Sequence, residues 1–117
     1  MDVIPTFEMV IMEREFQLVE AGQAVTLLCS IQDIMTTPGQ RFQFNPGTTP
    51  QIEIYNPGGT TKVVFTNMNF VSTGVYNYQH QTLAADEKGV YTARFKAVNG
   101  TMTGITDKVN VFKVTAQ

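Results

Sequence analysis

The sequence has no tryptophan, one cysteine and one histidine among its 117 residues. Cys29 alone cannot form a disulfide within the chain, which suits synthesis in a reducing compartment. One Cys and one His cannot supply the paired ligands of a zinc site, and a catalytic triad would have to use His80. His80 shares its predicted strand face with Tyr76 and Tyr78, so we interpret it as a packed or surface aromatic. We expect no catalytic residue, no metal and no cofactor.

Charge is also scarce. Charged residues make up 15% of the chain, against about 25% in a typical soluble domain, and the net charge is −2. No run of Lys or Arg provides the positive surface that nucleic acid or an anionic membrane would need. No apolar run is long enough for a membrane-spanning helix. Met1 to Pro5 lack the basic and long apolar regions of a secretory signal, so we expect either that the protein acts in the compartment where it is made or that the sequence has been trimmed.

Neutral polar residues take the place of charge: sixteen Thr, nine Gln and seven Asn. Thr favours strands, and apolar residues alternate with polar ones along most of the chain, which indicates half-buried β-strands. The length fits one domain, 1–117, with 1–6 as an N-terminal extension. We predict an all-β fold of seven strands packed as a sandwich. They lie within 7–20 and at 25–32, 51–55, 62–66, 75–80, 91–97 and 102–115.

The strand pattern is irregular near the N-terminus and contains a hairpin signal near residue 100. The apolar parity changes within the first twenty residues, which predicts a strand that kinks near Glu13 and Arg14; a helix over 8–20 is the rival interpretation. Asn99-Gly100 predicts a hairpin with a type I′ turn, in which both central residues have positive φ.

Two segments are candidates for recognition. The long connection 34–50 contains Arg41, Phe42 and Phe44 amid Pro, Gly and Thr, and loops at the ends of a sandwich are natural contact surfaces. The alternative is that both Phe side chains only cap the core. The N-terminal run Val3–Met12, with Ile4, Phe7 and Met9, has the character of a strand that pairs with a neighbour's edge. An ordinary first strand is the alternative.

The stretch Gly22-Gln23-Ala24-Val25-Thr26-Leu27-Leu28-Cys29 resembles the second strand of immunoglobulin-like domains. Asp86-Glu87-Lys88-Gly89-Val90-Tyr91 resembles their tyrosine corner, which implies that the Tyr91 hydroxyl bonds to the backbone and that Cys29 faces the core. The family's second cysteine would fall at Ala93, so no disulfide is expected. The three stretches Pro50–Gly59, Gly74–Tyr78 and Lys88–Phe95 together look like bacterial and phage immunoglobulin-like domains related to macroglobulin modules.

This sandwich hosts many roles, so the resemblance implies the fold more than the function. Our first hypothesis is a non-catalytic bacteriophage virion protein, a capsid decoration or tail accessory, that docks on capsid or tail subunits by an edge strand or end loops. It would be located in the virion and could form homo-oligomers. The alternative is a bacterial surface or secreted adhesion module that binds glycans by stacking Tyr76, Tyr78 and Phe42 on sugar rings.

Overall fold

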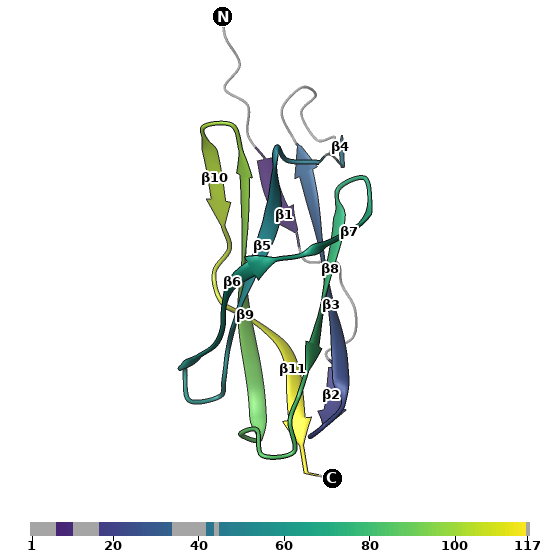
Figure 1. The fold of residues 1–117 in the computed structure, drawn as a ribbon. Helices are drawn as coiled ribbons and strands as arrows, with labels where there is room; N and C mark the ends of the chain where they lie inside the picture. Colours follow the sequence, from purple (N-terminus) through teal and green to yellow (C-terminus); the bar gives the residue numbers. More distant parts are fainter. Residues whose placement is uncertain (1–6, 11–16, 34–41, 44, 117) are drawn as a thin grey trace, which may run out of the picture.

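The computed structural model describes residues 7–10, 17–33, 42–43 and 45–116, which form eleven strands in two sheets (Figure 1). No helix that could cross a membrane occurs among these residues. The five-stranded sheet has the order β1 (Phe7–Val10), β3 (Ala24–Asp33), β8 (Val75–Gln81) and β7 (Asn69–Ser72), with β4 (Phe42–Gln43) also paired to β3.

The six-stranded sheet has the order β2 (Gln17–Glu20), β11 (Val109–Thr115), β9 (Gly89–Asn99), β5 (Thr48–Tyr55) and β6 (Thr61–Asn67), with β10 (Met102–Ile105) also paired to β9. All pairings are antiparallel except that of β2 with β11, which is parallel. The predicted all-β sandwich without a disulfide is confirmed.

The core lies between the two sheets and follows directly from the alternating sequence. In β3 every second side chain from Val25 to Ile31 is at most 4% exposed, and in β9 the same holds from Tyr91 to Ala97. A side chain of Val, Leu, Ile or Phe size contributes about 1.5–3 kcal/mol when fully buried. The inward faces therefore supply the main stabilising term, and the sheet edges and outer faces are left for contacts with other molecules.

The N-terminal region enters both sheets. β1 pairs with β3 in one sheet, and β2 pairs with β11 in the other. The chain thus changes sheet between these two strands, but Val19 is the buried side chain of β2 and Leu18 is 72% exposed, so the apolar parity that includes Leu18 does not mark the buried face of this strand. The rival helix over 8–20 is therefore wrong; the predicted kink itself lies at 11–16, outside the described residues.

The predicted last strand, 102–115, is interrupted. β10 and β11 lie one after the other along the same edge of β9, and Thr106 between them exchanges hydrogen bonds with Phe95. A bulge between Asn110 and Phe112 adds one residue to β11. The extra residue lets Val109 and Phe112, which are three positions apart, both pack against the core, a result that strict alternation forbids.

The β9–β10 hairpin turn lies one residue later than the sequence predicted. Asn99 pairs with Met102, so Gly100 and Thr101 are the central residues. Gly100 has a φ of 63°, and no described non-glycine residue has positive φ. This is the type II′ pattern, with Gly first, and not the type I′ turn expected from Asn-Gly. The Asn99 side chain instead accepts a hydrogen bond from the Gly47 amide at 3.2 Å.

Two further strands were not predicted. β4 lies in the long connection between β3 and β5, and β7 follows β6 after a single residue, Met68. Met68 is 3% exposed, and its sulfur accepts a hydrogen bond from the Cys29 thiol at 3.5 Å. The buried Met68 thus fixes the point at which the chain leaves one sheet and enters the other.

Candidate binding surface

β6 and β7 are the terminal strands of their respective sheets and follow each other in the chain (Figure 1). Each therefore has one side on which no described strand pairs with it. We call this side of the sandwich, β6 and β7 with the segment that follows β8, the open edge. Of the seven exposed large hydrophobic side chains in the described part of the chain, four belong to it: Val64, Phe70, Val71 and Leu83.

β7 contributes two of these side chains. Phe70 pairs with Tyr76 across the strands, and their rings meet edge to face with centroids 5.9 Å apart. Tyr76 is buried, but Phe70 at the end of the sheet remains 61% exposed. The register shifts between Phe70 and Ser72, so Val71 is an extra residue, and it is 49% exposed. Apolar surface at this edge thus results from the end of the sheet and a bulge.

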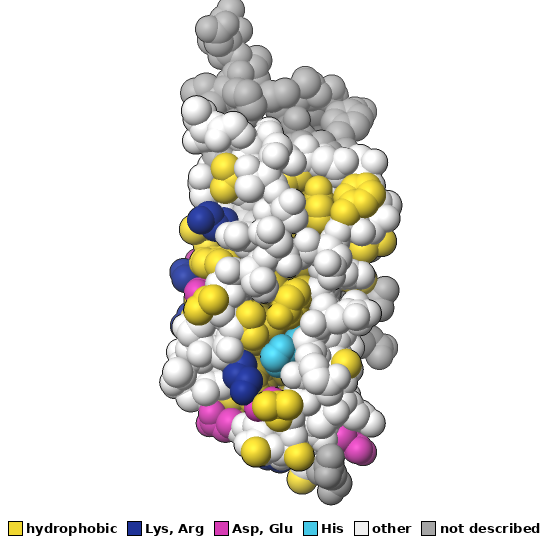
Figure 2. Space-filling model, in the orientation of Figure 1, with side chains coloured by type: hydrophobic (Ala, Val, Ile, Leu, Met, Phe, Trp, Pro, Cys, Tyr) yellow, Lys and Arg dark blue, Asp and Glu magenta, His cyan; other side chains and the backbone are white. Residues whose placement is uncertain are grey.

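β6 exposes Val64 for a related reason. Ile52 of β5 pairs with Thr66 and Ile54 pairs with Val63, so β6 uses one residue more than β5 over the same distance. The extra residue breaks the alternation, and Val64 is 71% exposed while Val63 packs against the core. Figure 2 shows hydrophobic side chains on this face over β7 and again between β6 and β8, where the one histidine, His80, lies.

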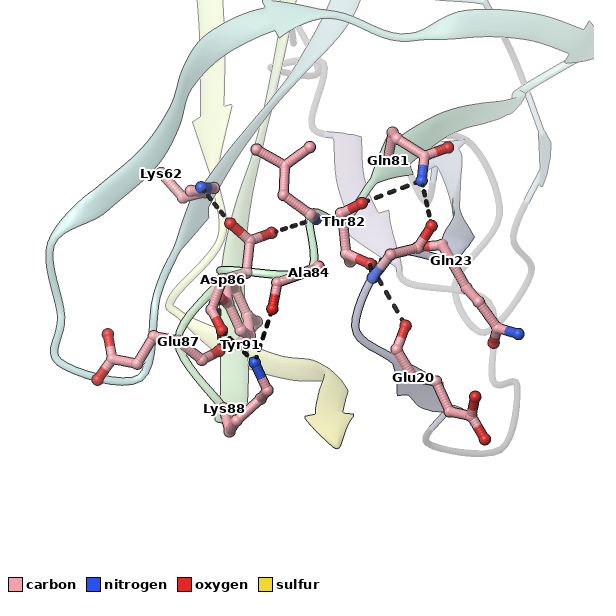
Figure 3. Close-up of polar contacts among 12 residues, drawn as sticks. Glu20, Gln23, Lys62, Gln81, Thr82, Ala84, Asp86, Glu87, Lys88 and Tyr91 are labelled. Atoms are coloured by element: carbon pink, nitrogen blue, oxygen red, sulfur yellow. Dashed lines mark hydrogen bonds and ion pairs between the residues drawn. The ribbon is translucent and has the colours of Figure 1, made fainter. Parts of the chain in front are cut away.

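A partly buried ion pair supports the other end of the open edge. Lys62 Nζ of β6 lies 2.7 Å from Asp86 Oδ1, and the Leu83 amide donates to Asp86 Oδ2 at 2.8 Å (Figure 3). The Asp86 side chain is 4% exposed and that of Lys62 is 32% exposed. Burial acts to raise the pKa of Asp86, but the hydrogen bonds from Lys62 and Leu83 outweigh it and hold the pKa below 3.8.

His80 is the second titratable group of this region. It is 6% exposed, and its ring lies 5.9 Å from that of Phe112. Among the described residues, His80 Nε2 has no hydrogen-bond partner. Burial lowers the pKa of His80 below 6.5, which outweighs the opposing effect of the Asp86 charge. A buried imidazole with a lowered pKa is neutral at physiological pH, so it adds no charge to the open edge.

The adjoining end of the sandwich is closed by hydrogen bonds (Figure 3). Tyr91 is 1% exposed, and its hydroxyl donates to the Glu87 carbonyl oxygen at 2.8 Å, the geometry of a tyrosine corner. Thr82 Oγ1 accepts from the Gly22 amide at 2.9 Å and donates to the Gln23 carbonyl oxygen at 2.6 Å. These contacts satisfy the Gly22 amide and the carbonyl groups of Gln23 and Glu87 within the chain.

The candidate residues of the sequence lie elsewhere. Ile4, Arg41 and Phe44 fall outside the described residues. Phe7 and Met9 belong to β1 and Phe42 to β4; their backbones are placed, and their side chains are outside the description. Phe7 and Phe42 both pair with Asp33 of β3, from its two sides. The two predicted contact segments therefore meet at one end of β3, and their role in binding stays a prediction.

Two residues with nucleophilic or basic groups are enclosed by the core. Cys29 is 0% exposed, and burial raises its pKa to about 12, so its thiol stays protonated at neutral pH. His80 faces inward, as described above. Tyr76 is 5% exposed, which leaves little of its ring for stacking on a sugar, whereas Tyr78 is partly buried against the core and its stacking stays a prediction. Their strand faces the other sheet, which the period-two pattern alone does not reveal.

The exposed residues of the open edge were not singled out from the sequence. Phe70 and Val71 are adjacent, so they do not alternate, and no strand was predicted there. Val64 and Phe65 are also adjacent within a strand that was predicted. Each pair of adjacent apolar residues could have indicated an exposed position. Neighbouring side chains in a strand point to opposite faces, or one of them belongs to a bulge.

Comparison with known proteins supports the fold. No protein-family model matches the chain, and no curated protein is significantly similar to it in sequence. Among solved structures, it is similar to the crystal structure of the Lin-41 filamin domain, with a TM-score of 0.56 and 13% sequence identity over 93% of each chain. At this identity the similarity extends to the fold alone, and the fold is an immunoglobulin-like β-sandwich.

Proposed function

We propose that this chain is a non-catalytic structural module of a bacteriophage virion, a capsid decoration or tail accessory of the macroglobulin-module-like type, and that it docks through the open edge. The main observation in support of this docking surface is the exposure of Val64, Phe70 and Val71 on the terminal strands of the two sheets. The enclosure of Cys29 and His80 supports a role in binding rather than in chemistry.

The open edge lacks the features that normally protect a strand edge. Terminal strands present unpaired N–H and C=O groups, and proteins usually place Lys, Pro or inward-pointing charges there to prevent pairing. β7 has the sequence Asn-Phe-Val-Ser and carries no charge. The one lysine of β6, Lys62, is held by Asp86. An extended segment of a partner can therefore approach β7 without displacing a charge.

Docking at this edge would combine two contributions to the free energy of binding. Backbone hydrogen bonds from β7 to an added strand would provide affinity with little dependence on sequence, and the exposed side chains of Phe70 and Val64 would provide apolar contact area. Each such side chain contributes about 1.5–3 kcal/mol when it becomes fully buried. A virion repeats the same docking site many times, so modest affinity per copy is sufficient when a partner binds several copies.

The assignment to a virion rests on the resemblance of Pro50–Gly59, Gly74–Tyr78 and Lys88–Phe95 to bacterial and phage immunoglobulin-like domains. The low charge and the single cysteine agree with an unexported accessory protein. A sandwich whose one cysteine, Cys29, is enclosed in the core is suited to a spacer or reinforcing part.

Cosedimentation with particles tests the proposal. We expect the protein to sediment with virions that lack it and the double variant Val64→Lys/Phe70→Lys to stay in the supernatant, because a lysine at a strand edge blocks pairing. Leu18→Lys is the matched control, since Leu18 is 72% exposed but lies on β2. Wild-type protein that remains soluble would contradict the virion role. Equal binding by the double variant would contradict the open edge.

The adhesion module remains the second candidate, and its original basis is weakened because Tyr76 is buried and Tyr78 faces the core. A glycan array separates the two. Saturable binding of one class of glycan, unchanged in the Val64→Lys/Phe70→Lys variant, would favour the adhesion module over the virion protein.

A further inference from the structure

The outer face of the six-stranded sheet concentrates positive charge. Arg94 and Lys96 of β9 alternate with buried Ala93, Phe95 and Ala97, so they point outward. Lys113 of β11 alternates with buried Phe112 and Val114. Lys108, which precedes β11, lies over the outward Tyr55 ring. We call Arg94, Lys96, Lys108 and Lys113 the cationic face.

The described lysines divide cleanly by location. Lys62 pairs with Asp86, and Lys88 donates to the carbonyl oxygens of Ala84 and Asp86, so both lysines outside the cationic face are bound within the chain. Lys96, Lys108 and Lys113 have no ion-pair partner among the described residues. On the same face, Arg94 is neutralised by Glu53 at 2.9 Å.

Aromatic rings hold part of this face in place. Lys108 Nζ lies 4.0 Å from the Tyr55 ring centroid, Arg94 lies 5.6 Å from Tyr55 and 5.7 Å from Phe65, and Lys96 Nζ lies 5.6 Å from Phe65. The rings of β5 and β6 thus lie beside the cations of β9 and beside Lys108. A cation–π contact restricts a long flexible side chain before any partner arrives, which lowers the entropy lost on binding.

We propose that the cationic face is a second docking surface and that its partner is an acidic protein segment that presents carboxylates to Lys96, Lys108 and Lys113. Two carboxylates lie at its margins, Glu20 at the end of β2 and Asp107 next to Lys108, and neither forms an ion pair among the described residues. Glu53, within the face, pairs with Arg94 and acts electrostatically on Lys108 without forming an ion pair with it. Lys96, Lys108 and Lys113 can therefore each still donate to a carboxylate of a partner, and a lysine ammonium suits a single carboxylate.

Nucleic acid fits this face less well. Binding of single strands uses aromatic rings on which bases stack, and Tyr55 is 5% exposed beneath Lys108 and Arg94. Phosphate recognition favours the bidentate fork of arginine, and the Arg94 Nε and NH2 groups already donate to Tyr55 and Glu53. The available groups are point charges on a rigid sheet, which matches an acidic surface or an extended acidic peptide.

Fluorescence anisotropy with labelled poly-L-glutamate tests this proposal, with an oligothymidylate of equal charge as the second probe. We expect saturable binding of poly-L-glutamate at low salt. Each of Lys96→Gln, Lys108→Gln and Lys113→Gln should weaken it by about two- to fivefold, the range for an exposed ion pair. Lys88→Gln, outside the cationic face, is the matched control and should leave the affinity within about twofold, since it lacks that ion pair. A melting curve for each variant verifies folding.

Three results would overturn the proposal: no saturable binding of poly-L-glutamate by the wild type, an equal loss in Lys88→Gln, or an oligothymidylate affinity as high as that for poly-L-glutamate. The open edge is not involved in this test. The Val64→Lys/Phe70→Lys variant should bind poly-L-glutamate at least as well as the wild type. The proposals for the open edge and for the cationic face are therefore tested independently.

Discussion

Removing the Tyr91 hydroxyl gives a direct test of how the closed end of the sandwich is held. Tyr91→Phe deletes the hydrogen bond to the Glu87 carbonyl oxygen and keeps the ring, which stacks on Phe112 with centroids 4.8 Å apart and planes 13° from parallel. A net hydrogen bond contributes about 0.5–1.5 kcal/mol to stability. Because Glu87 is exposed and water can reach its carbonyl group in the variant, we expect a loss of about 1 kcal/mol in the free energy of unfolding.

Urea unfolding followed by far-UV circular dichroism measures this loss, and thermal unfolding should show a decrease of about 4 °C in Tm. Tyr78→Phe is the matched control, because no described residue forms a hydrogen bond with the Tyr78 hydroxyl. A Tyr91→Phe variant as stable as the wild type would refute the structural role of this bond. An equal loss in Tyr78→Phe would show that the hydroxyl acts through general packing instead.

Gly89 has a φ of 131°, and an added Cβ would lie 3.0 Å from Pro57 Cγ, so Gly89→Ala should cost about 1–3 kcal/mol in urea unfolding while Gly58→Ala, with no atom nearer than 3.6 Å, costs little. The pKa values of His80 and Asp86 are both lowered in the folded state, so the unfolded chain binds more protons below pH 6.5 and again below pH 3.8. The free energy of unfolding should therefore decrease in two steps as the pH is lowered, the first from His80 and the second from Asp86. The His80→Gln variant should lose only the first step. Cys29 should react with a thiol reagent only at the rate of unfolding, and a fast reaction in native buffer would contradict its burial.

The sequence predicted the elements whose side chains alternate without interruption. β3, β8 and β9 each bury every second residue over most of their length, so period two alone located them. Tyr91 could be placed from the resemblance of Asp86–Tyr91 to a tyrosine corner, since that motif is local in sequence.

The features that the sequence did not predict depend on the pairing register between strands. The extra residues at Val64, Val71 and Val111 change which face each following residue occupies, and only the partner strand shows where such a residue is inserted. The hairpin at Gly100 shifted by one residue for the same reason: Asn99 is used as the last paired residue of β9. The Asn-Gly pair predicted that a turn is present, but not which residues occupy its central positions.

The candidate surfaces were unpredictable for a further reason. Phe70 is directly opposite buried Tyr76, and a pattern that counts apolar residues would assign both to the core. Phe70 is exposed because β7 ends its sheet, a property of topology rather than of local sequence. In the same way, Lys96 and Lys113 are far apart in sequence and share a face only because β9 and β11 are neighbours.

The two proposed surfaces differ in the force that acts on a partner, and this difference has a measurable consequence. Charge on the cationic face is screened over about 10 Å at 0.1 M salt, so binding there should weaken steadily as salt is added. Contacts of Phe70 and Val64 are apolar, and salts such as sulfate strengthen the burial of apolar surface. A virion that binds through both surfaces should release the protein partially in chloride and retain it in sulfate. Complete release by moderate chloride would place the main contact on the lysines and leave the open edge without a role in docking.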